Sequence, residues 1–140
     1  MQSFDFSWMV GLVIQEVRFN EPTQWSFSFD TNIGIRAECP WRLLQDGHVA
    51  TSSEDHLQQY GLPSPINAAA IATDMLQSRP VTRATVHDGT ADLVLELGDT
   101  LRLEIIPISS CYESLIVCTP SGFQVVAQGG GQVSSWSAGA

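Results

Sequence analysis

Apolar and polar residues alternate with a period of two through most of the chain, a pattern typical of strands that bury one face of a sheet. The first such segment covers residues 25–39, and its polar centre, Asp30-Thr31-Asn32, predicts a turn. Pairing Phe29 with Ile33 leaves a three-residue loop, in which Asn32 takes the left-handed conformation that Asn tolerates. The segment therefore predicts a β-hairpin.

The same pattern recurs 68 residues later without a gap, so that residues 93–105 match residues 25–37. In this second hairpin Glu96 is expected opposite Arg102 on the outer face, a favourable cross-strand pair. Because Thr100 is poorly suited to the left-handed position, we expect this loop to be longer or differently bent. A strand-like run precedes each hairpin, and the chain therefore predicts two related halves, about residues 9–45 and 79–128.

A third hairpin is predicted from residues 112–119 and 123–127, which flank the turn sequence Pro120-Ser121-Gly122. Leu115 and Val117 share one face, while Ile116 is apolar on the other. Such a hairpin is expected to be central in the sheet, covered by a helix or buried in a subunit contact.

Residues 65–77 break the alternation and predict the one principal helix. Ser64 suits an N-cap and Pro65 suits the first helical position, and Arg79-Pro80 ends the segment. The apolar stripe of this helix consists of Ala68, Ile71, Ala72, Met75 and Leu76. The tail, residues 134–140, is small and polar apart from one tryptophan and is expected to fray.

These elements predict an α+β fold, mainly antiparallel β-sheet, curled into a sandwich or open barrel whose opening the helix covers. The 140 residues suit a single domain, residues 1–140.

Charge narrows the choice of partner. The chain has 15 acidic residues and six basic ones, all arginine, for a net charge of −9. The lack of lysine excludes Schiff-base chemistry and the P-loop, which needs a lysine on the phosphates. Without a basic face, nucleic acid and anionic membranes are not expected as partners, whereas a basic protein is.

The remaining composition predicts a cytoplasmic protein without cofactor or metal. The longest apolar run, Trp8–Ile14, is too short to span a membrane, and no basic residue precedes it as in a signal peptide. The three cysteines form no CxxC pair and are expected to be reduced. The three histidines do not fall at metal-ligand spacing, and His48 and His56 are expected to be exposed to solvent.

The predicted register places Glu113 on the same face as Leu115 and Val117, so its carboxylate is expected to point into the core. A buried carboxylate needs a partner, and Arg42 is the preferred one because a guanidinium can donate two parallel hydrogen bonds. The pair either fixes the packing of the two halves or binds a ligand in a pocket lined by Trp41, Tyr112 and Asp55.

Two further motifs are read as structural. Glu54-Asp55 could be an acid-base pair, but acids in the first turn of a helix are ordinary. Gly129-Gly130-Gly131 lacks the lysine and the helix of a phosphate loop and predicts a turn or bulge.

The order of several short motifs resembles a bacterial family of small, uncharacterised β-rich proteins catalogued as a domain of unknown function. These motifs are Gly11, Pro40-Trp41-Arg42-Leu43, Ser53 with Asp55, Leu101 to Pro107, Tyr112-Glu113, Gly129-Gly130 and Trp136. The chain has Leu115 and Gln128 where the family tends to have Trp and Pro. The resemblance implies a protein with no established enzymatic activity, and some relatives look like immunity proteins that neutralise a toxin.

Three functional hypotheses follow. The first is a non-catalytic protein-binding module, immunity-like, whose acidic surface meets a basic protein. The second is a small-molecule-binding or enzymatic protein with a pocket near Trp41, Arg42, Tyr112 and Glu113. The third is a homodimer subunit joined through the third hairpin. No catalytic residue is predicted.

Overall fold

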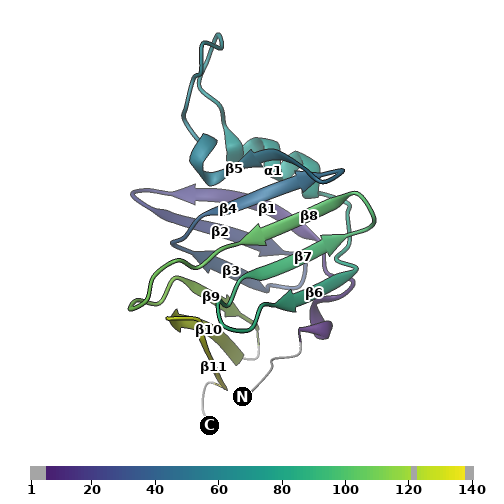
Figure 1. Ribbon diagram of the computed structural model, residues 1–140. Coiled ribbons are helices and arrows are strands. Elements are labelled where there is room, and N and C mark those ends of the chain that lie inside the picture. Colours follow the sequence, from purple (N-terminus) through teal and green to yellow (C-terminus); the bar gives the residue numbers. More distant parts are fainter. Residues whose placement is uncertain (1–5, 121–122, 138–140) are drawn as a thin grey trace.

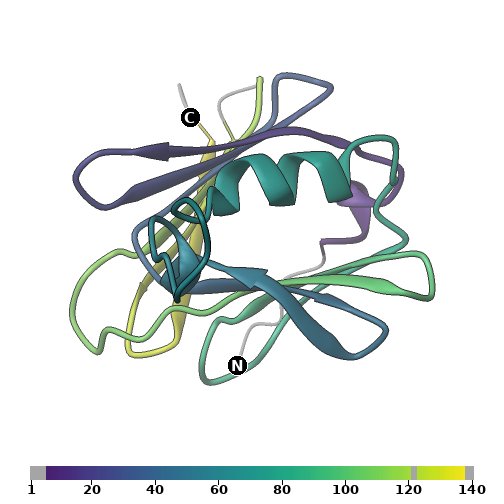
Figure 2. The ribbon, with the colours of Figure 1, turned by 90° about the horizontal axis from the view of Figure 1, so that it is seen from above.

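The computed structural model describes residues 6–120 and 123–137, and its strands form two antiparallel sheets that face each other (Figure 1). Seen from above, helix α1 (Ala68–Leu76) lies over the opening between the two sheets, next to β1 (Ile14–Asn20) and β5 (His48–Ser52) (Figure 2). The sheets do not close into a barrel. The predicted α+β class with mainly antiparallel sheet is therefore confirmed, in the form of a sandwich.

The first sheet has six strands and the second has five. The order in the first sheet is β1 (Ile14–Asn20), β2 (Gln24–Phe29), β3 (Gly34–Ala37), β9 (Leu115–Cys118), β10 (Phe123–Gly129) and β11 (Gln132–Ser137). The order in the second sheet is β5 (His48–Ser52), β4 (Trp41–Gln45), β8 (Leu101–Ile105), β7 (Leu93–Leu97) and β6 (Arg83–Val86).

The two predicted halves exchange strands between the sheets. Strands β1, β2 and β3 form a meander in the first sheet, and the following hairpin, β4 and β5, joins the second sheet beside β8. Strands β6, β7 and β8 form the corresponding meander in the second sheet, and β9 and β10 return to the first sheet beside β3. Each half therefore contributes to both sheets, and neither sheet is complete without the other half.

The registers of the first two hairpins agree with the sequence prediction. Phe27 lies opposite Ile35 in the first hairpin, and Leu95 lies opposite Leu103 in the second. The first turn has Asn32 at a φ of +58°, as predicted. In the second turn Gly98, with φ at +77°, takes the left-handed conformation. Thr100, a β-branched residue, therefore does not have to adopt the left-handed conformation.

The third hairpin begins later than the alternation predicts, at Leu115. Its strand β9 lies between β3 and β10, with Ile116 opposite Val126 and Arg36. This central position is one of the three expected for a strand with two apolar faces. Residues 121 and 122 of its turn lie outside the described part of the chain.

The helix α1 (Ala68–Leu76) starts three residues later than predicted. Asn67, not Ser64, is the N-cap, because its side-chain oxygen accepts a hydrogen bond from the Ala70 N–H at 3.0 Å. Ala68, Ala72 and Leu76 are buried, whereas Ile71 of the predicted stripe is 39% exposed. The buried face is therefore narrower than the sequence pattern indicates.

Helix α1 also protects the edge of the first sheet. The Thr73 hydroxyl accepts a hydrogen bond from the Val17 N–H at 2.9 Å. Its single proton has two acceptors within reach, the Ala69 carbonyl of its own helix at 2.8 Å and the Val17 carbonyl at 3.2 Å. The Gln77 amide donates to the carbonyl of Gln15. These contacts use backbone groups of β1 that would otherwise be free to pair with another chain.

The predicted fraying of the tail is wrong as far as residue 137. Residues 132–137 form β11, which pairs with β10 after a turn in which Gly129, Gly130 and Gly131 all have positive φ. A Cβ atom at Gly131 would lie 1.8 Å from the carbonyl oxygen of Gly89, so this turn requires glycine. Small polar side chains do not prevent the pairing because backbone groups form the ladder. Residues 138–140 lie outside the described part.

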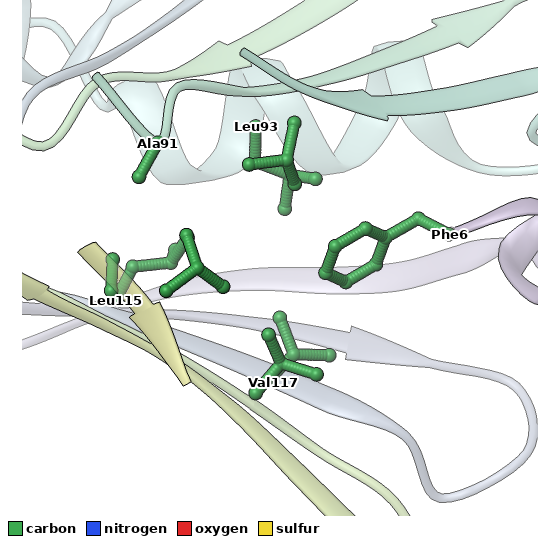
Figure 3. A pocket seen from close by; sticks show the side chains of 9 residues that line it. Phe6, Ala91, Leu93, Leu115 and Val117 are labelled. Carbon is green, nitrogen blue, oxygen red and sulfur yellow. The ribbon is translucent and has the colours of Figure 1, made fainter. Parts of the chain in front are cut away.

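Phe6 lies in the interior between the two sheets, as Figure 3 shows. Its ring faces Leu93 from the second sheet and Leu115 and Val117 from the first. The apolar cavity left among these side chains has a volume of about 10 Å³. Because a water molecule needs about 10–15 Å³ and polar partners, we expect this cavity to stay dry.

The position of the helix N-terminus can be tested with two substitutions. Asn67→Ala removes the side chain that accepts the Ala70 N–H, and we expect it to lower the free energy of unfolding by about 1 kcal/mol. Ser64→Ala lies before the helix and should change it by less than about 0.5 kcal/mol. Urea unfolding followed by circular dichroism measures both, and a larger loss in Ser64→Ala would contradict the observed helix start.

Candidate functional site

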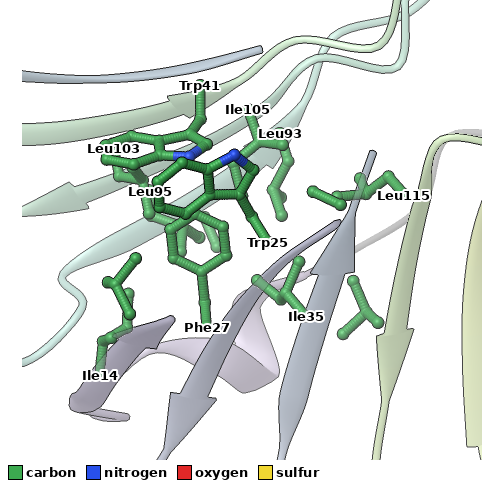
Figure 4. Packing of buried hydrophobic residues seen from close by; sticks show 14 of the residues in the cluster. Ile14, Trp25, Phe27, Ile35, Trp41, Leu93, Leu95, Leu103, Ile105 and Leu115 are labelled. Carbon is green, nitrogen blue, oxygen red and sulfur yellow. The ribbon is translucent and has the colours of Figure 1, made fainter. Parts of the chain in front are cut away.

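Trp41, a predicted pocket residue, belongs to the core. It is 1% exposed and lies at the start of β4, facing the first sheet. Its ring packs edge-on against Trp25 at 5.0 Å and against Phe27 at 5.7 Å between ring centroids (Figure 4). Such contacts add to the energy of burial. Trp41 therefore belongs to the core between the two sheets and stabilises the sandwich.

Arg42 points to the outer face of the second sheet. It lies opposite Glu104 in the pairing of β4 with β8 and forms an ion pair with that carboxylate. Arg102 reaches the same carboxylate from its own strand at 3.0 Å. The Glu104 side chain is 13% exposed, so two guanidinium groups compensate one largely buried charge.

Glu113 is exposed, and the predicted buried pair of Arg42 with Glu113 is wrong. The alternation that placed its carboxylate in the core assumed a strand from residue 112, but residues 109–114 form a loop. The Ser109 hydroxyl accepts hydrogen bonds from the N–H groups of Cys111 and Tyr112, both at 3.0 Å. This turn ends the period-two pattern before β9 begins.

The other predicted pocket residues lie apart from one another. Tyr112 is 49% exposed, and its hydroxyl donates a hydrogen bond to the Glu38 carbonyl at 3.4 Å. Asp55 lies in the 3-10 helix η2 (Ser53–Asp55) and accepts a hydrogen bond from the Tyr60 hydroxyl at 3.2 Å. The predicted residues Trp41, Arg42, Tyr112, Glu113 and Asp55 therefore do not converge on one site.

The predicted pair of Glu96 and Arg102 has the expected register but a different ionic partner. The two residues lie opposite each other in β7 and β8. Arg83 on β6 also lies opposite Glu96 and approaches it to 3.7 Å, while Arg102 pairs with Glu104. The outer face of the second sheet thus carries two separate groups of ion pairs, Glu104 with Arg42 and Arg102, and Glu96 with Arg83.

His56 occupies a position that sequence reasoning missed. The centroid of its ring lies 5.0 Å from the ring centroid of Trp25 and 5.2 Å from that of Phe19. Its Nδ1 atom accepts a hydrogen bond from the Ala68 N–H at 3.1 Å. This hydrogen bond assigns the ring proton to Nε2. His56 therefore links the loop after η2 to the start of α1. A histidine in a polar segment gives no signal of this contact in the sequence.

A shallow depression of about 560 Å³ lies beside His56. Strand β1 lines it with Glu16, Arg18 and Phe19, and α1 lines it with Ala69 and Ala70. The Nδ1 atom of His56 is occupied by the helix N–H, so the neutral ring could offer only its Nε2–H as a donor to this depression. With Nδ1 occupied and Nε2 protonated, the His56 ring is not a free base for proton abstraction.

The buried thiol of Cys39 is not a reactive group. Burial raises the pKa of the Cys39 thiol to about 12, against the smaller opposing effects of the Ile106 backbone and the Ser114 hydroxyl. Such a thiol is unreactive at neutral pH. Within the described residues, no group of three or more metal-ligating side chains is found. None of the helices described there has both the length and the apolar character to cross a membrane.

The end of the sandwich at β5, η2 and α1 has an unusual surface. Residues 43–78 contain no arginine or lysine and four acids, which are Asp46, Glu54, Asp55 and Asp74. We call residues 43–78 the acidic end. They make up about a quarter of the chain but include five of the nine described large apolar residues that are exposed, namely Val49, Leu57, Tyr60, Leu62 and Ile71. Acidic and apolar groups therefore occur together here.

No family model, curated protein or solved structure matches the chain.

The ion pairs of Glu104 with Arg42 and Arg102 can be tested by removing the charge of the Glu104 side chain. Glu104→Gln keeps the shape of the side chain but removes the charge that Arg42 and Arg102 share. Because both arginines are about half exposed, we expect a modest loss of about 1 kcal/mol in the free energy of unfolding. The loss should shrink in 1 M NaCl, where charges are screened.

Glu113→Gln is the matched control for this change. Its side chain is exposed, and we expect an effect below about 0.5 kcal/mol in urea unfolding. If Glu113→Gln lowered the free energy of unfolding by about 1 kcal/mol as well, the exposed position of Glu113 without a structural ion pair would be contradicted.

His56 predicts a pH dependence of stability. Burial lowers the pKa of His56 below the ordinary 6.5. The unfolded chain then binds a proton where the folded one does not, so this contribution to stability is present above about pH 6.5 and is lost as the pH falls. Thermal melts of wild type and His56→Gln between pH 8 and 5 should diverge, with a smaller decrease in the variant. His48→Gln, at an exposed histidine, should follow wild type.

Proposed function

We propose that the protein is a non-catalytic protein-binding module that binds a basic protein partner through its acidic surface. The proposal extends to an immunity-like role, in which the chain neutralises its partner, as the family resemblance implies. The observation that supports it most directly is the acidic end, residues 43–78, whose carboxylates form no ion pair among the described residues and which includes five exposed large apolar side chains.

The ion pairs explain why the negative charge at this end is available to a partner. Among the described residues, the arginine ion pairs go to Glu16, Glu96 and Glu104, all outside the acidic end. Arg42 immediately precedes this end but points to Glu104 on the outer face of the second sheet. The carboxylates of the acidic end therefore keep their full field for a positively charged surface, which raises the rate of encounter.

The apolar side chains at the same end supply the second requirement of an interface. Charge steers association, but affinity comes mostly from a few buried apolar or aromatic groups surrounded by polar ones. Tyr60 is 66% exposed and Leu57 is 59% exposed, and both lie within six residues after the acid Glu54 in the chain. This composition suits a surface that a partner protein covers.

The test is capture of a partner and its dependence on charge. The purified, immobilised chain is incubated with an extract of its source organism at 50 mM and 500 mM NaCl, and bound proteins are identified by mass spectrometry. We expect a basic protein that is retained at low salt and released at high salt. Recovery of the chain alone, or of a partner insensitive to salt, would contradict the proposal.

Two variants with equal charge changes sharpen this experiment. One neutralises the acidic end with Asp46→Asn, Glu54→Gln, Asp55→Asn and Asp74→Asn, and the other neutralises four acids elsewhere with Asp88→Asn, Asp92→Asn, Asp99→Asn and Glu113→Gln. We expect the first to slow association of the captured partner by about tenfold or more, measured by surface plasmon resonance. The second should have a clearly smaller effect.

A further inference from the structure

We propose that the loop of residues 57–66, here called the projecting loop, is the element that enters the partner. In this inference, which rests on the proposed function, Leu57, Tyr60 and Leu62 insert into an apolar groove on a protein whose groove is flanked by lysine or arginine. The loop connects η2 to α1 and extends beyond the sandwich, as the teal segment above β5 in Figure 1 shows.

The apolar side chains of this loop contribute little to the core. Leu57, Tyr60 and Leu62 are 59%, 66% and 48% exposed, and they fall within six consecutive residues. Single exposed apolar residues are common on protein surfaces, but a group of them on one projection marks an interaction site. Tyrosine is also one of the residue types that dominate binding energy at protein interfaces.

Hydrogen bonds give the projecting loop a defined shape. At its base, the Leu57 N–H donates to the Ile66 carbonyl and the Ile66 N–H donates to the Gln58 carbonyl, both at 2.8 Å. At its tip, the Leu62 N–H donates to the Gln59 carbonyl at 2.7 Å. The loop is therefore ordered before it meets a partner, which reduces the entropy lost on binding.

The backbone of the tip is unusual for its side chains. Tyr60 and Gly61 have φ values of +48° and +78°, the type I′ pattern in which both central residues are left-handed. Leu57, at the base, has a φ of +67°. Glycine or asparagine would adopt these conformations at lower cost. A tyrosine and a leucine held there indicate that the side chains themselves serve a purpose, because such strain gathers at functional sites.

The charges around the loop select the partner. Glu54 and Asp55 precede the loop, and the Tyr60 hydroxyl donates to the Asp55 carboxylate at 3.2 Å. Across the depression beside Leu57, β1 contributes Glu16, and Arg18 there is already bound to Glu16 at 3.0 Å. An apolar tip with an acidic surround complements an apolar groove with a basic rim, and it opposes nucleic acid and anionic lipid.

The test compares two variants that remove the same number of exposed apolar side chains. The loop variant carries Leu57→Asn, Tyr60→Asn and Leu62→Gln. Asparagine tolerates positive φ, so the turn and the melting temperature should be preserved. The control variant carries Val10→Gln, Ile108→Asn and Tyr112→Asn, at residues that are 49%, 68% and 49% exposed outside the acidic end.

The probe is the basic protein captured from the source organism, expressed and purified. We expect the dissociation constant, measured by calorimetry, to rise at least 100-fold for the loop variant and less than threefold for the control variant. A photo-crosslinking residue in place of Tyr60 should form a covalent link to this protein, whereas one in place of Ile108 should not. The crosslinked peptide of the partner should contain apolar residues next to lysine or arginine.

The outcomes separate this inference from the proposed function. If a basic partner is captured but binds the loop variant as tightly as wild type, the projecting loop is not the contact element, although the protein-binding function stands. If no basic protein is captured, both fall. If wild type binds neutral phosphatidylcholine vesicles and the loop variant does not, the loop is a membrane-contacting element and the inference is overturned.

Discussion

The three residues that join β3 to β4, residues 38–40, carry the chain from one sheet to the other, and the core depends on this crossing. Because the connection is so short, β4 must begin directly across from the end of β3. Trp41 then lies between the sheets, against Trp25 and Phe27. The second half makes the opposite crossing between β8 and β9, so that each half completes the sheet of the other. The resulting buried residues form one cluster.

The crossing also decides which charged groups meet. Arg42 follows Trp41, and since neighbouring residues of a strand point to opposite faces, its side chain must lie outside when Trp41 lies inside. The neighbour of β4 is β8, so the carboxylate opposite Arg42 is that of Glu104. The arginines on the second sheet are thus used in ion pairs, two across neighbouring strands and one along β8. The carboxylates of residues 43–78 have no arginine partner among the described residues.

The projecting loop is not part of the packed core of the sandwich. Helix α1 covers the edge at β1 through Thr73, and Phe6 lies in the interior between the two sheets. The projecting loop lies between η2 and α1, held at its base by hydrogen bonds and by the contact of His56 with the helix N-terminus. A rigid scaffold that presents an ordered loop is a common arrangement for recognition, because the loop can vary without loss of the core.

Local patterns in the sequence predicted the strands of the three hairpins, the strand before each of the first two, and the hairpin registers, because the period of two and the turn residues act over a few positions only. They did not predict β4, β5 or β11. Phe27 opposite Ile35 and Leu95 opposite Leu103 could be derived in this way. The helix segment was also predicted, although its N-cap was not, since Ser64 and Asn67 are equally good caps in isolation. The negative charge of residues 43–78 can be read from the sequence, but the position of these residues on the surface of the folded chain cannot.

Tertiary structure alone decided which strands became neighbours in each sheet. Pairing between distant strands is set by packing of whole sheets, and no local pattern states that Arg42 meets Glu104 or that the chain turns at Ser109 and leaves Glu113 outside. The contact of His56 with Ala68 and the projection of Tyr60 have the same origin. The alternation of apolar and polar side chains depends only on residues that are neighbours in the sequence. A site, in contrast, is built from residues far apart in the sequence that the folded chain brings together.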